Sequence, residues 1–202
     1  MRVRAVLLDA DGVVQENPDG WLERLKATVG DGKGQEFADD VFATEQAAMT
    51  GERDFGDVIA EVADRWGLTG SREDLLEHWR RIEVSAPVVE LVGELRAAGI
   101  RCCLASNQNS FRARYMRDAL GYEKIFDSVF FSCDLGVLKT SPRFFTSVLS
   151  ELDLPAGEVL FVDDGEHYVE TARDVGLRAF VWSTGRGIDV LRAELAAHGL
   201  PA

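Results

Sequence analysis

Two pairs of aspartates in this sequence have the surroundings of reactive or metal-binding carboxylates. Asp9 and Asp11, which are separated by Ala10, follow a run of four apolar residues. The adjacent Asp163 and Asp164 follow a second such run. A carboxylate can act as a nucleophile or as a general acid or base, and its oxygens are ligands that Mg²⁺ prefers. Because the chain contains eighteen aspartates, either pair alone could arise by chance. Their meaning depends on what lies beside them in the fold.

Two further polar sites lie near apolar runs and could bind an anion. Ser106 and Asn107 offer a hydroxyl and an amide, although such a pair also starts ordinary turns. Lys139 is one of only four lysines among 22 basic residues and precedes a proline-started helix, although a lone lysine is usually a solvated surface charge. Together with the carboxylates, these groups would supply a nucleophile, an acid or base, a hydroxyl and an ammonium. The next basic candidates for binding an anion are Arg112, Arg114 and Arg143.

The elements that must position these residues follow from the apolar pattern. Five apolar runs predict buried parallel strands at residues 2–8, 101–105, 128–131, 159–162 and 178–181. Apolar residues at helical spacing predict helices between them, and Pro87 and the Ser141-Pro142 pair are typical helix starts. This alternation predicts an α/β fold, a doubly wound parallel sheet. Ligands of such sheets bind at the carboxyl ends of the strands, where the four polar sets are expected to converge.

One stretch, residues 16–85, interrupts the alternation. It contains no convincing strand, a Gly-rich segment at 30–34 separates two helical runs, and Ser71-x-x-Asp74 is a helix-capping signal. We therefore predict two parts, an α/β core of residues 1–15 and 86–202 and a small inserted helical domain of residues 16–85. Both ends of the insertion are expected close to the polar site.

Composition narrows the class of protein and its partners. The 202 residues are 46% hydrophobic and 28% charged, which is the balance of a globular domain with room for an insertion. No apolar run approaches the roughly 18 residues of a membrane span or the roughly 7–15 of a signal-peptide core, which predicts a cytoplasmic location and no membrane partner. A net charge of −13 disfavours binding to nucleic acid, because the phosphate backbone is also negative. The cysteines at 102, 103 and 133 form no disulfide or metal pattern and are expected to be buried.

Taken in order, the motifs resemble those of the haloacid dehalogenase superfamily, in its phosphatase-like branch with a helical cap between the first and second motifs. The resemblance covers nearly the whole chain and implies a Rossmann-like core with a helical cap domain. Thr140 stands where many relatives have a proline, and Gly165-Glu166-His167 departs from the usual continuation of the fourth motif. The matching segments are Leu7-Leu8-Asp9-Ala10-Asp11-Gly12-Val13-Val14, Leu104-Ala105-Ser106-Asn107, Gly136-Val137-Leu138-Lys139 with Pro142, and Phe161-Val162-Asp163-Asp164.

The resemblance implies Mg²⁺-dependent hydrolysis of a small phosphorylated metabolite through an aspartyl-phosphate intermediate. Asp9 would be the nucleophile and a metal ligand, and Asp11 the general acid and base, with its backbone carbonyl as a further metal ligand. Asp164 would bind Mg²⁺ directly, and Asp163 would lie nearby or act through water. The groups holding the phosphoryl oxygens would be Ser106, the backbone amide of Asn107 and Lys139.

Other activities stay open at this point. A phosphomutase acting on a sugar phosphate uses the same two aspartates. A 2-haloacid dehalogenase is less favoured, because dehalogenases of the superfamily have a different residue at the position of Asp11. A non-catalytic binding protein would not need the complete set of candidate residues.

Substrate choice is expected to lie in the inserted domain. The candidates near its ends are Glu16, Asn17, Trp21, Glu45 and Gln46, each of which could instead be an ordinary surface or core residue. Neither the particular substrate nor the oligomeric state, monomer or homodimer, follows from the sequence.

Overall fold

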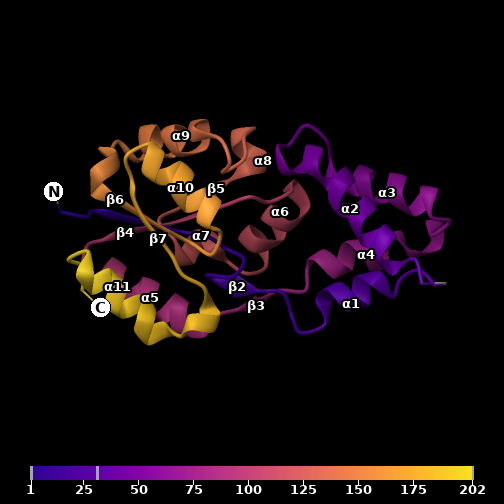
Figure 1. Cartoon of the computed structure of the whole chain (residues 1–202), viewed down its shortest axis with the longest axis horizontal. Helices are drawn as coiled ribbons and strands as arrows, with labels where there is room; N and C mark the ends of the chain where they lie inside the picture. Colours follow the sequence, from indigo (N-terminus) through magenta and orange to yellow (C-terminus); the bar gives the residue numbers. More distant parts are fainter. Residues whose placement is uncertain (1, 31, 202) are drawn as a thin grey trace.

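Five parallel strands form the central sheet of the computed structural model, which describes residues 2–30 and 32–201 (Figure 1). The strand order β5-β4-β1-β6-β7 places the first strand of the sequence in the middle. The strands are β1 (Ala5–Leu8), β4 (Arg101–Ser106), β5 (Ser128–Phe131), β6 (Val159–Asp163) and β7 (Arg178–Val181). The predicted doubly wound α/β fold is thereby confirmed. The first strand is shorter than predicted and begins at Ala5, whereas β4 and β6 each include the first polar residue after the apolar run.

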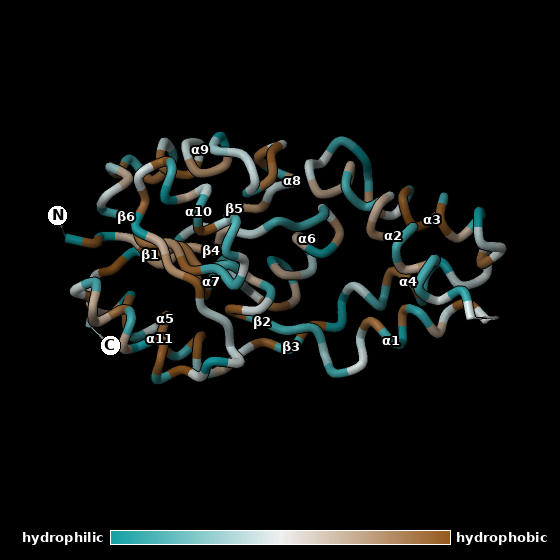
Figure 2. The backbone as a smooth tube through the Cα atoms, viewed as in Figure 1, coloured by the Kyte–Doolittle hydropathy of each residue, from teal (hydrophilic) through white to brown (hydrophobic). Residues whose placement is uncertain are grey.

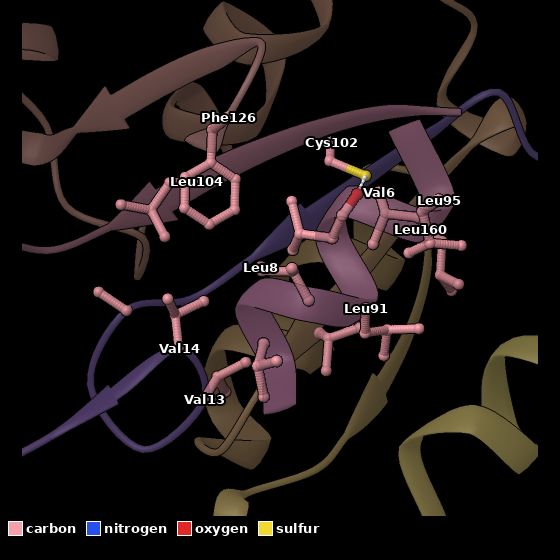
Figure 3. Close-up of a cluster of buried hydrophobic side chains, with 14 of the residues drawn as sticks. Val6, Leu8, Val13, Val14, Leu91, Leu95, Cys102, Leu104, Phe126 and Leu160 are labelled. Atoms are coloured by element: carbon pink, nitrogen blue, oxygen red, sulfur yellow. Dashed lines mark hydrogen bonds between the residues drawn. The ribbon is translucent and has the colours of Figure 1, made fainter. Parts of the chain in front are cut away.

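Helices cover both faces of the sheet because both faces of each central strand are apolar. Val6 and Leu8 of β1 point into one hydrophobic cluster, and Ala5 and Leu7 point into another. The first cluster is shown in Figure 3, where Leu91 and Leu95 pack against the strand residues. Its helices are α5 (Ala86–Ala97), α6 (Ser110–Asp118), α7 (Tyr122–Ile125) and α11 (Ile188–Ala197). The opposite face is covered by α9 (Pro142–Leu152) and α10 (Glu166–Asp174), with α8 (Ser132–Leu135) and the short 3₁₀ turns η2 (Ala156–Glu158) and η3 (Thr184–Arg186) completing the connections.

A separate group of helices, which we call the helical module, lies at the end of the molecule opposite the two termini (Figure 1). It encloses its own hydrophobic cluster, in which Phe37, Phe55 and Trp79 are buried. In the hydropathy view the brown positions of these helices alternate with teal ones, as expected for one-faced helices (Figure 2). The module consists of α1 (Trp21–Lys26), α2 (Gly34–Met49), α3 (Phe55–Arg65), η1 (Thr69–Ser71) and α4 (Arg72–Trp79).

The two chain segments that join the module to the sheet pair with each other, which the sequence did not predict. β2 (Gln15–Glu16) and β3 (Glu83–Val84) form a two-stranded antiparallel ribbon. The prediction of no strand between 16 and 85 is therefore wrong at both ends. The reason is that two residues are too few to show an alternating pattern.

The structure confirms two of the three predicted helix starts, one by a capping hydrogen bond and one by the position of a proline. Ser141 Oγ accepts a hydrogen bond from Arg143 N, and Pro87 lies in the first turn of α5. Ser71 precedes α4 but makes no capping hydrogen bond, because the chain enters this helix from a 3₁₀ turn instead of from extended backbone.

Two of the three cysteines are buried as predicted. Cys102 and Cys103 are buried in the two faces of the sheet, whereas Cys133 is only half-buried, contrary to expectation. Among the described residues, no helix is both long and apolar enough to cross a membrane.

Candidate active site

The carboxyl ends of three neighbouring strands bring the predicted catalytic residues together. Leu8 of β1 is in register with Leu104 of β4 and Val162 of β6, so the residues that follow these positions lie at one edge of the sheet. Asp9 N donates a hydrogen bond to Val162 O at 2.9 Å, which extends the β1–β6 ladder by one residue and fixes Asp9 beside Asp163. The sheet thus joins residues that lie far apart in sequence.

Asp9, Asp163 and Asp164 form a compact carboxylate cluster. One oxygen from each lies within 4.8 Å of the others. Lys139 Nζ lies 2.6 Å from Asp9 Oδ1 and donates a hydrogen bond to Asp163 Oδ2 at 2.7 Å. Lys139 is only 1% exposed. Burial alone would lower the pKa of Lys139, but Asp9 and Asp163 raise it above its usual range, so this ammonium stays charged.

The cluster has more negative charge than Lys139 can balance. The Asp9–Lys139 contact lacks hydrogen-bond geometry, so Asp9 Oδ1 is a buried oxygen that finds no hydrogen-bond donor among the described residues. Burial raises the pKa of Asp9 to about 6 against the opposing effect of Lys139, and burial and Asp9 raise the pKa of Asp164. Three carboxylates around a single ammonium leave excess negative charge, which fits a hard divalent cation such as Mg²⁺.

Gly12 allows the cluster to form. Its φ is +82°, and a Cβ at this position would lie 2.4 Å from Asp164 Oδ2. Only glycine gives both the left-handed backbone and the close approach. The chain turns at this glycine, and Asp11 forms an isolated bridge with Gln15.

Asp11 is held by side chains that do not touch Asp9. Its Oδ1 accepts hydrogen bonds from Arg112 at 2.6 Å and from Gln15 at 2.9 Å, and its Oδ2 accepts one from Gln108 at 2.6 Å. Arg112 also donates to Asn17 Oδ1 at 3.1 Å. Arg112 was considered as a cation for the substrate anion, but in the structure it is buried behind Asp11.

The residues at the carboxyl end of β4 line the same site. Ser106 is buried, and its Oγ accepts a hydrogen bond from Gln108 Nε2 at 3.3 Å. Asn107 Oδ1 accepts from the backbone of Lys139, and Asn107 Nδ2 donates to the hydroxyl of Tyr168 at 3.3 Å. Asn107 therefore fixes the loop that carries Lys139 as well as the ring beside it.

A cavity of about 510 Å³ opens over the carboxylates and extends to the helical module. Three of the candidates for substrate choice, Glu16, Asn17 and Gln46, line it. The remaining lining residues are Asp9, Asp11, Gly12, Met49, Ser106, Asn107, Leu138, Lys139, Thr140, Asp164 and Tyr168.

The other two candidates for substrate choice are core residues of the module, so that part of the prediction is wrong. Trp21 is buried and donates from Nε1 to His78 O at 3.0 Å. Glu45 is buried and accepts hydrogen bonds from Trp79 at 3.2 Å and from Asn109 of the sheet domain at 2.6 Å. Glu45 thus links the module to α6 instead of facing the cavity.

Several residues of the site gave no recognisable sequence signal. Gln108 follows the Ser106-Asn107 motif and could have been suspected only from its closeness to it, and the sequence suggests Arg112 as an anion binder but not as a partner of Asp11. Met49 and Tyr168 come from helices far away in the sequence, and their place in the site depends on how these helices pack.

The fold is a doubly wound parallel α/β sheet, and its candidate site is a carboxylate cluster at the carboxyl ends of the central strands. A family model of the haloacid dehalogenase-like hydrolases matches residues 3–176, and the chain belongs to this family.

Solved structures share the fold over nearly the whole chain. A HAD family enzyme from Bacteroides thetaiotaomicron, in complex with magnesium and inorganic phosphate, has a TM-score of 0.80 at 18% identity and covers 94% of this chain and 98% of its own. L-2-haloacid dehalogenase from Xanthobacter autotrophicus has a TM-score of 0.66 at 19% identity, covering 96% of this chain and 83% of its own.

Curated relatives are similar over shorter stretches. Sesquiterpene phosphatase astK of Aspergillus oryzae is 28% identical over 126 residues, which are 60% of this chain and 63% of that protein. Bifunctional epoxide hydrolase 2 of Rattus norvegicus is 28% identical over 99 residues, which are 46% of this chain. The match spans only 18% of the length of that relative.

Proposed function

We propose that this protein is a Mg²⁺-dependent phosphatase that hydrolyses small phosphomonoesters through a phosphorylated Asp9. The observation that carries the proposal is the convergence of Asp9, Asp163 and Asp164 within 4.8 Å, at a cavity that Asp9, Asp11, Lys139 and Asp164 line. The magnesium and phosphate bound to the Bacteroides enzyme and the phosphatase activity named for the Aspergillus relative support it.

Asp9 has the position and charge expected of a nucleophile. The Lys139 ammonium 2.6 Å away lowers the pKa of Asp9 against the effect of burial and so favours the ionised form that attack requires. In the first step the Asp9 carboxylate forms a bond to phosphorus and the bond from phosphorus to the leaving alcohol oxygen breaks. Asp11 donates the proton that the departing alkoxide needs. In the second step Asp11 takes a proton from water and the water oxygen attacks phosphorus. The bond from phosphorus to the Asp9 oxygen breaks, which releases phosphate and restores the Asp9 carboxylate.

The surrounding residues hold the phosphoryl group and the metal. Asp9, Asp164 and the backbone carbonyl of Asp11 would bind Mg²⁺, with Asp163 beside them or acting through water; when bound, the ion would neutralise charge on the phosphoryl oxygens. Ser106, the backbone amide of Asn107 and Lys139 would contact the phosphoryl oxygens. The helical module would act as a cap, and we propose residues 16–85 as its extent.

Phosphate release from an aryl phosphate, measured with and without Mg²⁺, tests the proposal. The wild-type protein should release phosphate only with Mg²⁺, and Asp9→Asn should be inactive while keeping its circular dichroism spectrum and melting temperature. The exposed Asp19 provides the matched control, since Asp19→Asn should keep full activity. Acid quenching followed by mass spectrometry should find a phosphoryl group on the wild-type protein and none on Asp9→Asn. An active, folded Asp9→Asn protein would contradict the mechanism.

The same protein should not release halide from a 2-haloacid. The dehalogenase similarity is at the level of fold, and dehalogenases of the superfamily have a different residue at the position of Asp11. Halide release faster than phosphate release would favour the dehalogenase reading. Intramolecular phosphoryl transfer on a sugar phosphate would favour the phosphomutase reading.

A further inference from the structure

The side chains of the outer cavity wall indicate which leaving groups the site can accommodate. Beyond the residues assigned to the phosphoryl group and the metal, the wall consists of Gly12, Glu16, Asn17, Gln46, Met49, Leu138, Thr140 and Tyr168. This wall offers one carboxylate, two amides, two hydroxyls, a thioether, an aliphatic side chain and an aromatic ring. It can therefore hydrogen-bond hydroxyl or amino groups and pack against a short carbon chain.

The charges that line the cavity are strongly unbalanced. Asp9, Asp11, Asp164 and Glu16 contribute carboxylates, whereas Lys139 is the single basic side chain among the described lining residues. Lys139 is buried between two carboxylates at 2.6 and 2.7 Å. It can meet the phosphoryl group at the floor of the cavity but cannot reach a second anion at the wall.

The nearest buried arginine is also engaged. Arg112 contacts Asp11 and Asn17, both of which line the cavity, but its side chain is only 7% exposed and lies behind them. Its charge is paired with Asp11 at 2.6 Å. A second anionic group on a substrate would thus face Glu16 without a free cation to pair with.

Glu16 is held at the wall by two contacts, one from Thr184 and one from strand β3. Its side chain accepts a hydrogen bond from Thr184 Oγ1, and its backbone belongs to the β2–β3 ribbon that joins the module to the sheet. A carboxylate held in this way repels an anionic leaving group and accepts hydrogen bonds from a neutral or cationic one.

From this charge pattern, and resting on the proposed function, we infer that the substrates are phosphomonoesters of polar alcohols without a second anionic group, such as polyols or amino alcohols. Phosphorylated acids and bisphosphates are selected against by Glu16 and by the absence of a free basic side chain at the described part of the wall.

Matched pairs of compounds test this inference. Glycerol phosphate is compared with phosphoglycerate, phosphoethanolamine with phosphoserine, and a hexose monophosphate with the bisphosphate. Each compound is used as a competitor of aryl phosphate hydrolysis in the presence of Mg²⁺, so that its inhibition constant is obtained whether or not it is turned over. We expect the member without the extra anionic group to bind at least about tenfold more tightly in every pair.

A substitution at the wall assigns the effect to Glu16. In Glu16→Gln the preference within each pair should shrink several-fold, because the fixed negative charge is removed while the hydrogen-bonding shape is kept. Glu23→Gln is the control, since Glu23 is an exposed acid of the module outside the cavity lining, and its preference should match that of the wild type.

The outcomes separate this inference from the proposed function. Equal or tighter binding of the phosphorylated acids and bisphosphates, with aryl phosphate hydrolysis intact, would overturn the inference and leave the phosphatase proposal standing. Unchanged preferences in Glu16→Gln would remove Glu16 as their cause and overturn the inference as well. No Mg²⁺-dependent hydrolysis of any phosphate ester would overturn the phosphatase proposal and, with it, the inference.

Discussion

Arg112 and Asp11 form an ion pair across 101 residues of sequence, with Arg112 Nη2 lying 2.6 Å from Asp11 Oδ1. Arg112 is buried and Asp11 is about one-third exposed at its side chain, so the arginine supports the carboxylate from the protein side and leaves its other side open to the cavity. Gln108 holds the second oxygen of Asp11 at 2.6 Å. These contacts make Arg112 a positioning residue for the proposed proton donor.

Arg112→Lys should lower kcat for alkyl phosphates by roughly 10–100-fold with a smaller change in KM, because a lysine cannot hold both Asp11 and Asn17 and small misplacements of a catalytic group are costly. Steady-state kinetics measure the split between kcat and KM. Arg114→Lys, an exposed neighbour on the same helix, should behave as the wild type. An unchanged kcat in Arg112→Lys would show that Asp11 needs no such support.

Asp11→Asn should slow the phosphorylation step for alkyl phosphates about 10²–10⁴-fold and for aryl or acyl phosphates much less. The reason is that a poor leaving group needs a proton and a good one does not. Single-turnover measurements of phosphoenzyme formation with both kinds of substrate test this. Equal losses for both would contradict the role of Asp11 as a general acid.

Lys139→Met should reduce kcat/KM about 10²-fold or more and lower the free energy of unfolding by roughly 3–5 kcal/mol, because it leaves Asp9 and Asp163 buried without a cation. Lys139→Arg should restore neither fully, since a planar guanidinium does not reproduce the position of an ammonium. Kinetics and urea unfolding measure the two effects. The exposed Lys124 is the control, and Lys124→Met should change neither. Near-normal kinetics in Lys139→Met would contradict the assignment.

Gly12→Ala should weaken Mg²⁺ binding by about 10-fold or more, because the new Cβ would displace the Asp164 carboxylate. The Mg²⁺-dependent rise in melting temperature gives the affinity without reference to activity. Gly99 has the same φ of +82° with no neighbour within 4 Å of a Cβ, so Gly99→Ala controls for backbone strain alone. If both variants respond to Mg²⁺ like the wild type, the close approach to Asp164 has no role in metal binding.

His78 should make the protein less stable as the pH falls from about 6.5 toward 4. Burial, together with Arg81 and Arg24, lowers the pKa of His78 to about 4, and its Nε2 has no hydrogen-bond partner among the described residues. In the unfolded chain His78 takes up a proton near its usual pKa of about 6.5, so between these values protonation favours unfolding.

His78→Phe removes this titration and keeps an aromatic ring against Trp21, whose centroid lies 4.2 Å from that of His78. The difference in free energy of unfolding between the wild type and the variant should shift against the wild type by up to about 3 kcal/mol between pH 7 and pH 4. Urea unfolding across this range measures it. Taking the difference cancels the titration of Glu45 and of the active-site carboxylates. A difference that does not vary with pH would show that His78 is not titrated by unfolding.

The sequence by itself determined the sheet and the members of the carboxylate cluster. The apolar runs of the central strands β1, β4 and β6 each end at a polar residue, and parallel strands place these ends at one edge. Asp9, Ser106 and Asp163 could therefore be placed beside one another without coordinates. The β2–β3 ribbon could not be predicted, because two residues carry no period.

Tertiary structure alone decided which polar side chains face the cavity and which are used to hold the protein together. Glu45 and Glu16 are both acids of the same region in the sequence, yet Glu45 is buried against Asn109 and Trp79, and Glu16 lies at the cavity wall. Arg112 likewise supports Asp11 instead of meeting the substrate. The direction of a long polar side chain depends on partners brought near by helix packing, and residue type and spacing do not specify those partners.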